Sequence, residues 1–309
     1  MTRRLATVDL GTNTVRLLVV EAEGVRWRPL RQAQRVTRLG EGQGAAGRLL
    51  EDPMRRTLET VAEFVAAARV LGAAEVRVVA TSAVREAPNR TEFVARLREA
   101  TGHDVTVVSG ADEARLTLRG VAAALPELAG SFLLFDIGGG STEFVLACGG
   151  RLAAAVSLRL GVVGLAERFM DDGPVDWARF GFMRDEITGR LEREIPESLA
   201  AARAPALVGT AGTVTTLAAL DLALPAYDPA RVHGHILARP AVDRLLARLG
   251  AMTVAERAAL PCLERGRADL IIPGIAICLA AMARLGYDSL VVSDCGLREG
   301  ILCEILSGP

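Results

Sequence analysis

An internal repeat constrains the fold of this 309-residue chain more than any other feature. Residues 8–19, VDLGTNTVRLLV, align without gaps with residues 135–146, FDIGGGSTEFVL, so that Asp9 matches Asp136. In each copy an apolar run ends in Asp-x-Gly, a small polar loop follows, and a second apolar run returns. This pattern is typical of a β-hairpin whose tight turn needs glycine. A unit that occurs twice predicts two similar domains.

Helix and strand patterns alternate along the rest of the chain. Strand patterns occur in VRVVATSA, VTVVS, ALVG and SLVVSD. Apolar positions at helical spacing predict helices near residues 53–71, 90–100, 111–124, 161–170, 177–202, 240–249, 267–285 and 297–306. Alternation of this kind favours α/β sheets covered by helices.

A domain boundary is predicted near Pro126, where the first alternating series ends. We therefore expect one domain over residues 1–125 and a second over residues 126–295. The last helix, at about residues 296–309, is expected to pack back on the first domain. The fold class predicted is α/β, with two domains built on one plan.

Charge and composition exclude several classes of function. The 36 basic residues are all arginine and face 37 acidic residues, for a net charge of −1, which argues against nucleic acid or a membrane surface as the main partner. The absence of lysine excludes the P-loop motif and Schiff-base chemistry. Five scattered cysteines indicate neither a disulfide framework nor a zinc site. The apolar stretch at residues 270–285 is too short to span a bilayer, and we expect a cytoplasmic protein.

Three short loops rich in glycine, serine and threonine follow strand patterns: DLGTNT, DIGGGST and VGTAGT. Successive backbone N–H groups in such loops bind anions, and a helix after the third loop would add its positive end. Gly209 and Thr210 of that loop are therefore candidate phosphate-binding residues. Asp9 and Asp136 stand where strand meets loop, where a carboxylate can hold Mg²⁺ or a similar hard cation such as Mn²⁺ directly or through water; the alternative is an Asx turn. Together these features indicate a site that handles phosphate.

The sequence resembles the exopolyphosphatase and guanosine pentaphosphatase (Ppx/GppA) family of the acetate kinase, sugar kinase, Hsp70 and actin superfamily. The matching segments run in family order from residue 9 to residue 301: DLGTNTVRL, TSAVREAPN, SGADEARLTLRGV, DIGGGSTEF, VGTAGTVTTLAAL, VHGHIL, GRADLIIPGIAI and SDCGLREGIL. The Asp-x-Gly loops alone indicate only the superfamily, whereas TSAVREA, DEARL and GLREG are specific to the family. The resemblance implies two ribonuclease H-like domains of the actin-like ATPase architecture and hydrolysis of a terminal phosphoanhydride in a cleft between them.

The resemblance also implies roles for individual residues. Glu113 of DEARL corresponds to the family's catalytic glutamate, Glu143 of DIGGGSTE is its partner, and Asp136 matches the metal-associated aspartate. Positions expected to bind phosphate are Asn13, Arg85, Gly138, Gly139, Gly140, Ser141 and, as an additional group, Arg267. Longer members of the family have a further helical domain, so a grip on long polyphosphate would be weaker here or supplied by a homodimer.

The chemistry required agrees with these residue types. Phosphoryl transfer to water needs an in-line water, a carboxylate to orient and deprotonate it, and positive groups on the phosphoryl oxygens. We expect an exopolyphosphatase that releases orthophosphate from polyphosphate ends. The alternatives are a guanosine pentaphosphate 5′-phosphohydrolase, a kinase of the same superfamily, and a non-catalytic sensor of polyphosphate or alarmone. His233 and His235 have no third metal ligand near them in sequence, and a structural role is favoured.

Overall fold

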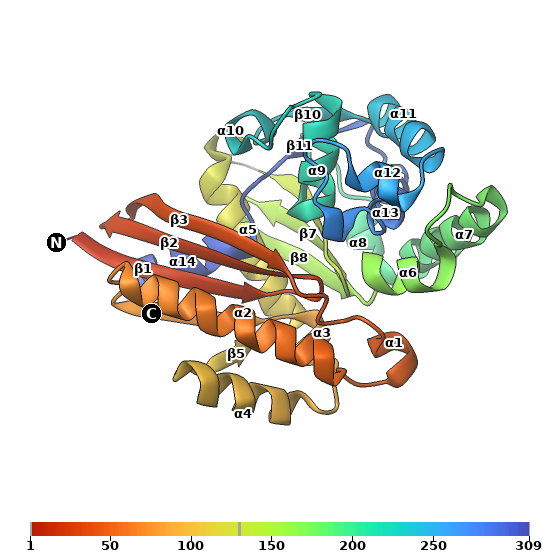
Figure 1. Ribbon diagram of the computed structural model, residues 1–309. Coiled ribbons are helices and arrows are strands. Elements are labelled where there is room, and N and C mark those ends of the chain that lie inside the picture. The colour runs from red at the N-terminus through yellow and green to blue at the C-terminus, as the bar shows by residue number, and fades with distance from the viewer. Residues whose placement is uncertain (1, 129–130, 309) are drawn as a thin grey trace. The chain divides into compact units, whose positions relative to one another are not determined.

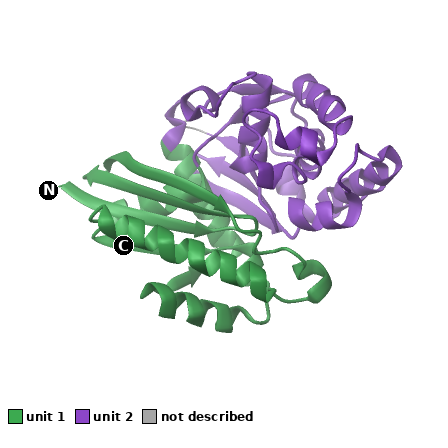
Figure 2. Ribbon diagram, viewed as in Figure 1, with its two compact units in different colours: residues 1–123, 296–309 green, residues 124–295 purple. Residues whose placement is uncertain are grey.

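The computed structural model describes residues 2–128 and 131–308. The chain divides into two compact units: unit 1 is Met1–Ala123 with Gly296–Pro309, and unit 2 is Ala124–Cys295 (Figure 2). Each unit has a β-sheet with helices packed on it (Figure 1). Unit 1 therefore combines the first 123 residues with the last helix of the chain.

Unit 1 contains a five-stranded sheet in the order β3-β2-β1-β4-β5. Strands β1, β2 and β3 form an antiparallel meander, and β4 and β5 continue the sheet parallel to β1. The bounds are β1 Thr2–Leu10, β2 Thr14–Glu23, β3 Arg26–Val36, β4 Glu75–Ala80 and β5 Val105–Val107. The hairpin predicted from the first copy of the repeat is β1–β2, and its turn holds the DLGTNT loop.

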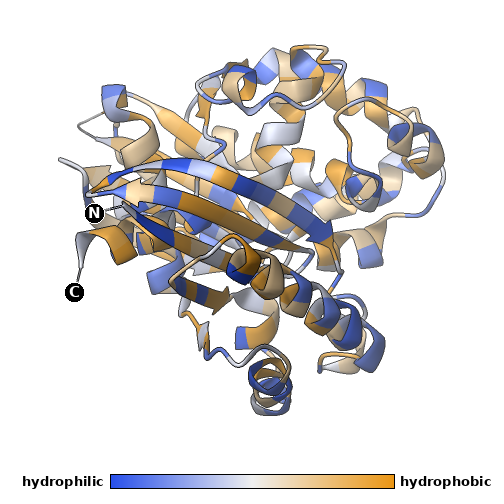
Figure 3. Cartoon of the chain, turned by 60° about the vertical axis from the view of Figure 1, so that its left-hand side comes forward, coloured by the Kyte–Doolittle hydropathy of each residue, from blue (hydrophilic) through white to orange (hydrophobic). Residues whose placement is uncertain are grey.

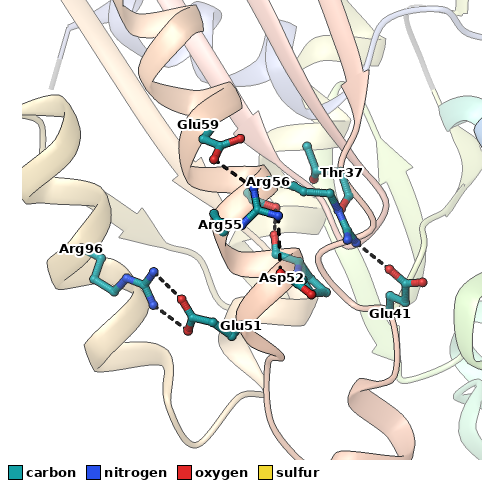
Figure 4. Close-up of polar contacts among 10 residues, drawn as sticks. Thr37, Glu41, Glu51, Asp52, Arg55, Arg56, Glu59 and Arg96 are labelled. Atoms are coloured by element: carbon teal, nitrogen blue, oxygen red, sulfur yellow. Dashed lines mark hydrogen bonds and ion pairs between the residues drawn. The ribbon is translucent and has the colours of Figure 1, made fainter.

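Helices cover both faces of this sheet. Helices α2 (Glu51–Val70) and α4 (Arg90–Thr101) bury apolar residues against one face of the sheet. Arg96 of α4 forms a bidentate ion pair with Glu51 of α2 (Figure 4). On the other face, Leu116 of α5 (Gly110–Ala124) and several side chains of α14 (Leu297–Ser307) share a second apolar cluster. Two short helices, α1 (Gln43–Ala46) and α3 (Ser82–Arg85), complete the unit.

Helices α5 and α14 contact each other backbone to backbone. A Cβ on Gly120 would lie 2.0 Å from the carbonyl oxygen of Gly296, and a Cβ on Gly300 would lie 1.8 Å from that of Leu116. Neither position has room for a side chain, because the obstructing atoms belong to the main chain. Gly300, the second glycine of the GLREG segment, thus allows α14 to approach closely the helix that carries Glu113.

Unit 2 contains a six-stranded sheet in the order β10-β11-β9-β6-β7-β8. Strands β6, β7 and β8 form an antiparallel meander, β9 and β11 run parallel to β6, and β10 is an antiparallel edge strand. The bounds are β6 Phe132–Ile137, β7 Thr142–Cys148, β8 Arg151–Leu158, β9 Leu207–Thr210, β10 Ile236–Ala238 and β11 Ser289–Val292. The series β8-β7-β6-β9-β11 repeats the strand plan of unit 1, and β10 is an addition.

The helices of unit 2 bury one large apolar core with the sheet, and the buried helix α13 contributes many of its residues. Their bounds are α6 Val162–Phe169, α7 Trp177–Glu194, α8 Glu197–Ala200, α9 Ala211–Asp221, α10 Pro229–Val232, α11 Arg239–Gly250, α12 Val254–Ala258 and α13 Ile271–Leu285, with 3₁₀ turns η1 at Pro126–Leu128 and η2 at Arg265–Arg267. Within residues 2–128 and 131–308 no helix is both long and apolar enough to cross a membrane.

Two sequence expectations were wrong in detail. The single helix predicted over residues 177–202 is two helices, α7 and α8, which are separated at Pro196 because proline lacks the N–H that a continuing helix needs. Strands β3 and β8 were not predicted. Strand β3, RWRPLRQAQRV, is an edge strand without a buried residue, so it lacks the apolar alternation that marks a strand in sequence (Figure 3).

Candidate functional site

The two Asp-x-Gly loops have the same backbone geometry. The N–H of Gly11 donates to the carbonyl of Thr14 at 3.0 Å, and the N–H of Gly138 donates to the carbonyl of Ser141 at 2.9 Å. A Cβ at Gly11 or Gly138 would lie 3.0 or 2.9 Å from the same carbonyl oxygen. Glycine is thus needed in both loops for close approach of the chain to itself. The repeat seen in the sequence is a repeat in structure.

In unit 1, Asp9 is the penultimate residue of β1 and is 8 % exposed. The loop after it is held in place by the chain that follows β3, because the carbonyl of Asn13 accepts hydrogen bonds from the N–H groups of Thr37 and Arg38, both at 3.0 Å. The Asn13 amide group donates to the hydroxyl of Thr14 at 3.4 Å. Two predicted residues, Asp9 and Asn13, therefore belong to one ordered turn.

Two other predicted residues of unit 1, Arg85 and Glu113, form an ion pair. Arg85 Nη1 lies 2.7 Å from Glu113 Oε2 and also donates to the carbonyl of Val108 at 3.1 Å. The side chains of Arg85 and Glu113 are 16 % and 10 % exposed, so the pair is shielded from water. A carboxyl group that can act as a general base thus lies beside a cation in a shielded position.

The start of α5 explains why Glu113 stands at this point. The Ser109 hydroxyl accepts the N–H of Asp112 at 3.1 Å, and the Ser109 carbonyl accepts the N–H of Glu113 at 2.9 Å. Ser109 thus caps the helix, and Glu113 falls in its first turn, where the helix dipole stabilises negative charge. The sequence SGADE contains both the cap and the acid.

In unit 2, Asp136 of β6 and Glu143 of β7 are directly opposite each other in the antiparallel register, so both side chains lie on the same face of the sheet. Glu143 is 2 % exposed, and its Oε1 accepts a hydrogen bond from the Ser157 hydroxyl at 2.7 Å. Ser157 was missed in the sequence because β8, on which it lies, was not predicted. The repeat could have located it, since a third strand follows each hairpin.

The glycines between β6 and β7 lie against the first turn of α6. The N–H of Val163 donates to the carbonyl of Gly139 at 2.9 Å, and that of Val162 to the carbonyl of Gly138 at 3.2 Å. A Cβ on Gly161 would lie 2.2 Å from the Gly139 oxygen. The carbonyl side of the loop is therefore fixed by α6. Gly140 and Ser141 complete the turn, and Ser141 is buried.

In the third loop, VGTAGT, three residues also have structural features of their own. The Thr210 hydroxyl donates to the carbonyls of Ser293 (3.0 Å) and Cys295 (2.9 Å). Because its proton is used within the protein, a contact of Thr210 with phosphate would use its backbone N–H. A Cβ on Gly209 would lie within 3.2 Å of three side chains, so Gly209 is a packing glycine. The residue with a left-handed backbone is Ala211, with φ 70°, and not a glycine.

Arg267 completes the set of predicted residues in unit 2. Its Nε donates to Glu264 Oε2 at 3.0 Å, and its side chain is 15 % exposed. The guanidinium lies against Gly212 in the first turn of α9, since a Cβ on Gly212 would be 1.5 Å from Arg267 Nη1. An arginine from the GRAD segment is thus placed at the end of the VGTAGT loop.

One candidate was missed in unit 1. Arg16 of β2 is directly opposite Asp9 of β1 in the antiparallel register. Opposed residues of such a pair point to the same face, so the side chains of Arg16 and Asp9 share one face of the sheet. The gapless repeat contained the signal, because Arg16 occupies the position that Glu143 has in the second copy.

Histidine and cysteine do not contribute to a metal centre in the described parts of the chain, where no three His, Cys, Asp or Glu side chains converge. His233 Nε2 lies 3.0 Å from the carbonyl oxygen of Ala124, and His235 Nε2 lies 2.9 Å from Asp221 Oδ2. Both rings are engaged with neighbouring groups of the protein. Carboxylates of the two loops remain the candidate ligands for a hard cation.

Comparison with known proteins agrees with this arrangement. Exopolyphosphatase 2 of Mycobacterium tuberculosis is 36 % identical over 322 aligned positions, which cover 98 % of this chain and 98 % of the relative. A crystal structure of an exopolyphosphatase from Cytophaga hutchinsonii has a TM-score of 0.91 at 29 % identity and covers 99 % of this chain and 98 % of that one. The Aquifex aeolicus Ppx-GppA enzyme has a TM-score of 0.80 at 31 % identity and covers 98 % and 99 %.

The two mixed sheets with the same strand plan are those of an α/β protein built from two similar halves, and the predicted α/β fold class is confirmed. The chain belongs to the Ppx/GppA phosphatase family, whose pattern matches residues 18–308. It is a hydrolase, and the family resemblance found in its motifs is confirmed.

Proposed function

We propose that this protein is an exopolyphosphatase that hydrolyses the terminal phosphoanhydride bond of inorganic polyphosphate and releases orthophosphate. The observation that carries the proposal is the shielded carboxylate of Glu113, which is paired with Arg85 in the first turn of α5. The names of its full-length relatives, which are exopolyphosphatases, support the choice of polyphosphate.

In the proposed reaction, water attacks the terminal phosphorus atom in line with the bridging oxygen. The new bond is phosphorus to water oxygen, the bond to the bridging oxygen breaks, and the shortened chain leaves with that oxygen. Glu113 accepts the proton of the water, and Glu143, held by Ser157, orients the water. Arg85, Arg267 and the N–H groups of the three glycine loops stabilise the phosphoryl oxygens.

The donor set suits a hard divalent cation. Asp136 and Glu143 are opposite each other in the β6–β7 register. Asp9 is the residue of unit 1 that corresponds to Asp136. Mg²⁺ is typically held by one or two carboxylates with the remaining positions taken by water and substrate phosphate, so a dedicated cage of protein ligands is not needed. Asp9 and Asp136 are the residues proposed to hold it. When bound, the ion neutralises charge on the phosphate oxygens.

Glu113→Gln tests the proposed base. A positioned general base contributes about 10²–10⁴-fold to the rate, so kcat for phosphate release from polyphosphate should fall by about that factor while polyphosphate binding is retained. The matched control is Asp112→Asn, because Asp112 is the adjacent acid and its side chain is 53 % exposed. Near-normal turnover by Glu113→Gln would refute the assignment.

Substrate choice is tested by comparing kcat/KM for long polyphosphate, short polyphosphate and guanosine pentaphosphate under one set of conditions. The proposal expects the highest value for polyphosphate, with orthophosphate as the product. A higher value for guanosine pentaphosphate would identify the protein as a guanosine pentaphosphate 5′-phosphohydrolase. Transfer of label from ATP to an acceptor would indicate a kinase, and binding without phosphate release a sensor.

A further inference from the structure

Gly212 lies inside a helix, where glycine is unfavourable. It is the second residue of α9, is buried, and has no left-handed φ that would require glycine. Alanine is the better helix former by about 1 kcal/mol. A reason other than backbone conformation must therefore account for the absence of a side chain at this point.

The space beside Gly212 is filled by the guanidinium of Arg267. A Cβ on Gly212 would lie 1.5 Å from Arg267 Nη1, 2.5 Å from Cζ and 3.0 Å from Nη2. All three of these nearest atoms belong to the same guanidinium, and none belongs to the main chain. The absence of a side chain at Gly212 thus leaves space for the guanidinium of Arg267. Arg267 cannot occupy its present position when residue 212 has a Cβ.

Glu264 holds the same guanidinium from the other direction. Its Oε2 accepts the Arg267 Nε–H at 3.0 Å, and its carbonyl accepts the Arg267 backbone N–H at 2.8 Å. The short turn η2 is therefore closed by both the main chain and the side chain. With Nε engaged by Glu264, the Nη atoms are the ones directed to the first turn of α9.

The electrostatics of this arrangement suit an anion. The N-terminus of a helix carries partial positive charge, so a guanidinium placed against the first turn of α9 is repelled by it. A phosphate at this point would be attracted by both groups, and N–H groups at a helix start are suitable donors to it. Glu264 compensates part of the repulsion and keeps the arginine in place.

We propose that Gly212 and Glu264 are positioning residues for Arg267: together they set its guanidinium at the start of α9 as a preorganised phosphate-binding group. The inference depends on the proposed function, because it assumes that Arg267 contacts substrate phosphate. It adds two residues that act through Arg267 and do not themselves need to touch the substrate.

Gly212→Ala separates this role from a role in folding. Because the obstructing atoms are the end of a flexible side chain, the protein should fold with a Tm at or above that of the wild type, while kcat/KM for polyphosphate falls about 10- to 100-fold. Glu264→Gln should lower kcat/KM in the same direction. The controls are Gly181→Ala, a helix position with open space around its Cβ, and Glu194→Gln, which breaks a Glu–Arg pair with Arg190 in the same unit.

A double-mutant cycle gives the decisive measurement. In the Arg267→Ala background there is no guanidinium to displace, so Gly212→Ala should cause no further loss of kcat/KM. An equal loss in both backgrounds would overturn the inference, because Gly212 would then act independently of Arg267. Wild-type kcat/KM in Arg267→Ala would refute the phosphate contact of Arg267 and with it the inference, whereas absence of phosphate release by the wild type would refute the proposed function itself.

Discussion

The two hairpins that hold the Asp-x-Gly loops share a backbone and differ in charge. In unit 1, Asp9 of β1 faces Arg16 of β2, and in unit 2, Asp136 of β6 faces Glu143 of β7. The loop hydrogen bonds beside these pairs agree closely, at 3.0 and 2.9 Å. The same backbone therefore places an acidic residue opposite a basic one in unit 1 and two acidic residues opposite each other in unit 2.

The third strand of each meander extends this difference. In unit 2 the strand β8 places Ser157 beside Glu143, where its hydroxyl donates to the carboxylate, and in unit 1 the strand β3 places Gln34 beside Arg16. The buried acid of unit 1 comes instead from a helix, as Glu113 of α5. A duplicated fold can thus supply acids from different elements, because side chains on a common backbone are free to diverge.

The largest expected effect comes from Glu143, whose corresponding position in the first copy of the repeat is Arg16. Glu143→Gln should lower kcat by about 10²–10⁴-fold, as expected for a residue that orients the attacking water. Arg16→Gln, which removes the positive charge on the face shared with Asp9, should lower kcat/KM by only about tenfold. Steady-state phosphate release measures both.

Equal losses of activity from these two substitutions would contradict this prediction, because the two hairpins would then contribute equally to catalysis. A control is Gln34→Glu, which changes the charge beside Arg16 without altering an acid of unit 2. Its effect should be confined to KM, since Gln34 is not proposed to take part in the chemical step.

The shared backbone predicts matching losses of stability. Gly11→Ala and Gly138→Ala each place a Cβ about as close to a main-chain carbonyl, so each should lower the free energy of unfolding by about 1–3 kcal/mol. Gly149→Ala is not a suitable control because its φ is positive, whereas Gly181→Ala, with open space around it, is. Denaturant titration measures the differences. A loss in one loop without the other would show that the two turns are not equivalent.

The sequence was sufficient to predict the fold where its signals are local. The gapless repeat located both hairpins, and apolar alternation located the buried strands around them. Strand β3 escaped because an exposed edge strand buries little and so leaves no apolar pattern. Pro196 marks the break between α7 and α8, but the prediction of a single helix followed the helical spacing of the apolar residues.

Contacts between residues distant in sequence could not be predicted. The Arg85–Glu113 pair joins residues 28 positions apart. The contact of the Arg267 guanidinium with Gly212 depends on packing between η2 and α9. Gly212 lies in the VGTAGT motif, and only the structure shows that the space beside it is filled by the side chain of Arg267. Sequence patterns identify residue types, whereas mutual positions follow from tertiary packing.

The smallest expected effect compares ion pairs of the two units. Arg96 holds Glu51 in unit 1 (Figure 4), and Arg168 holds Glu186 in unit 2, each through two hydrogen bonds. The hydrogen bonds from these arginines lower the pKa of both carboxyls below the ordinary value of 4.5. A carboxyl with a lower pKa in the folded chain adds stability above its unfolded pKa and loses that contribution as pH falls through the folded value.

Glu51→Gln and Glu186→Gln should therefore each lower Tm slightly at pH 7, and the difference from the wild type should shrink as the pH is lowered below about 4.5 and through the lowered pKa of each carboxyl. Both pairs reach the surface, so water and salt weaken them and the shifts should be small. Glu99 is an exposed residue of α4, and Glu99→Gln should leave Tm unchanged across this pH range. A Tm difference that does not shrink as the pH falls would mean that these side chains stabilise their units through packing, because the contribution of the ion pairs requires charged carboxyls.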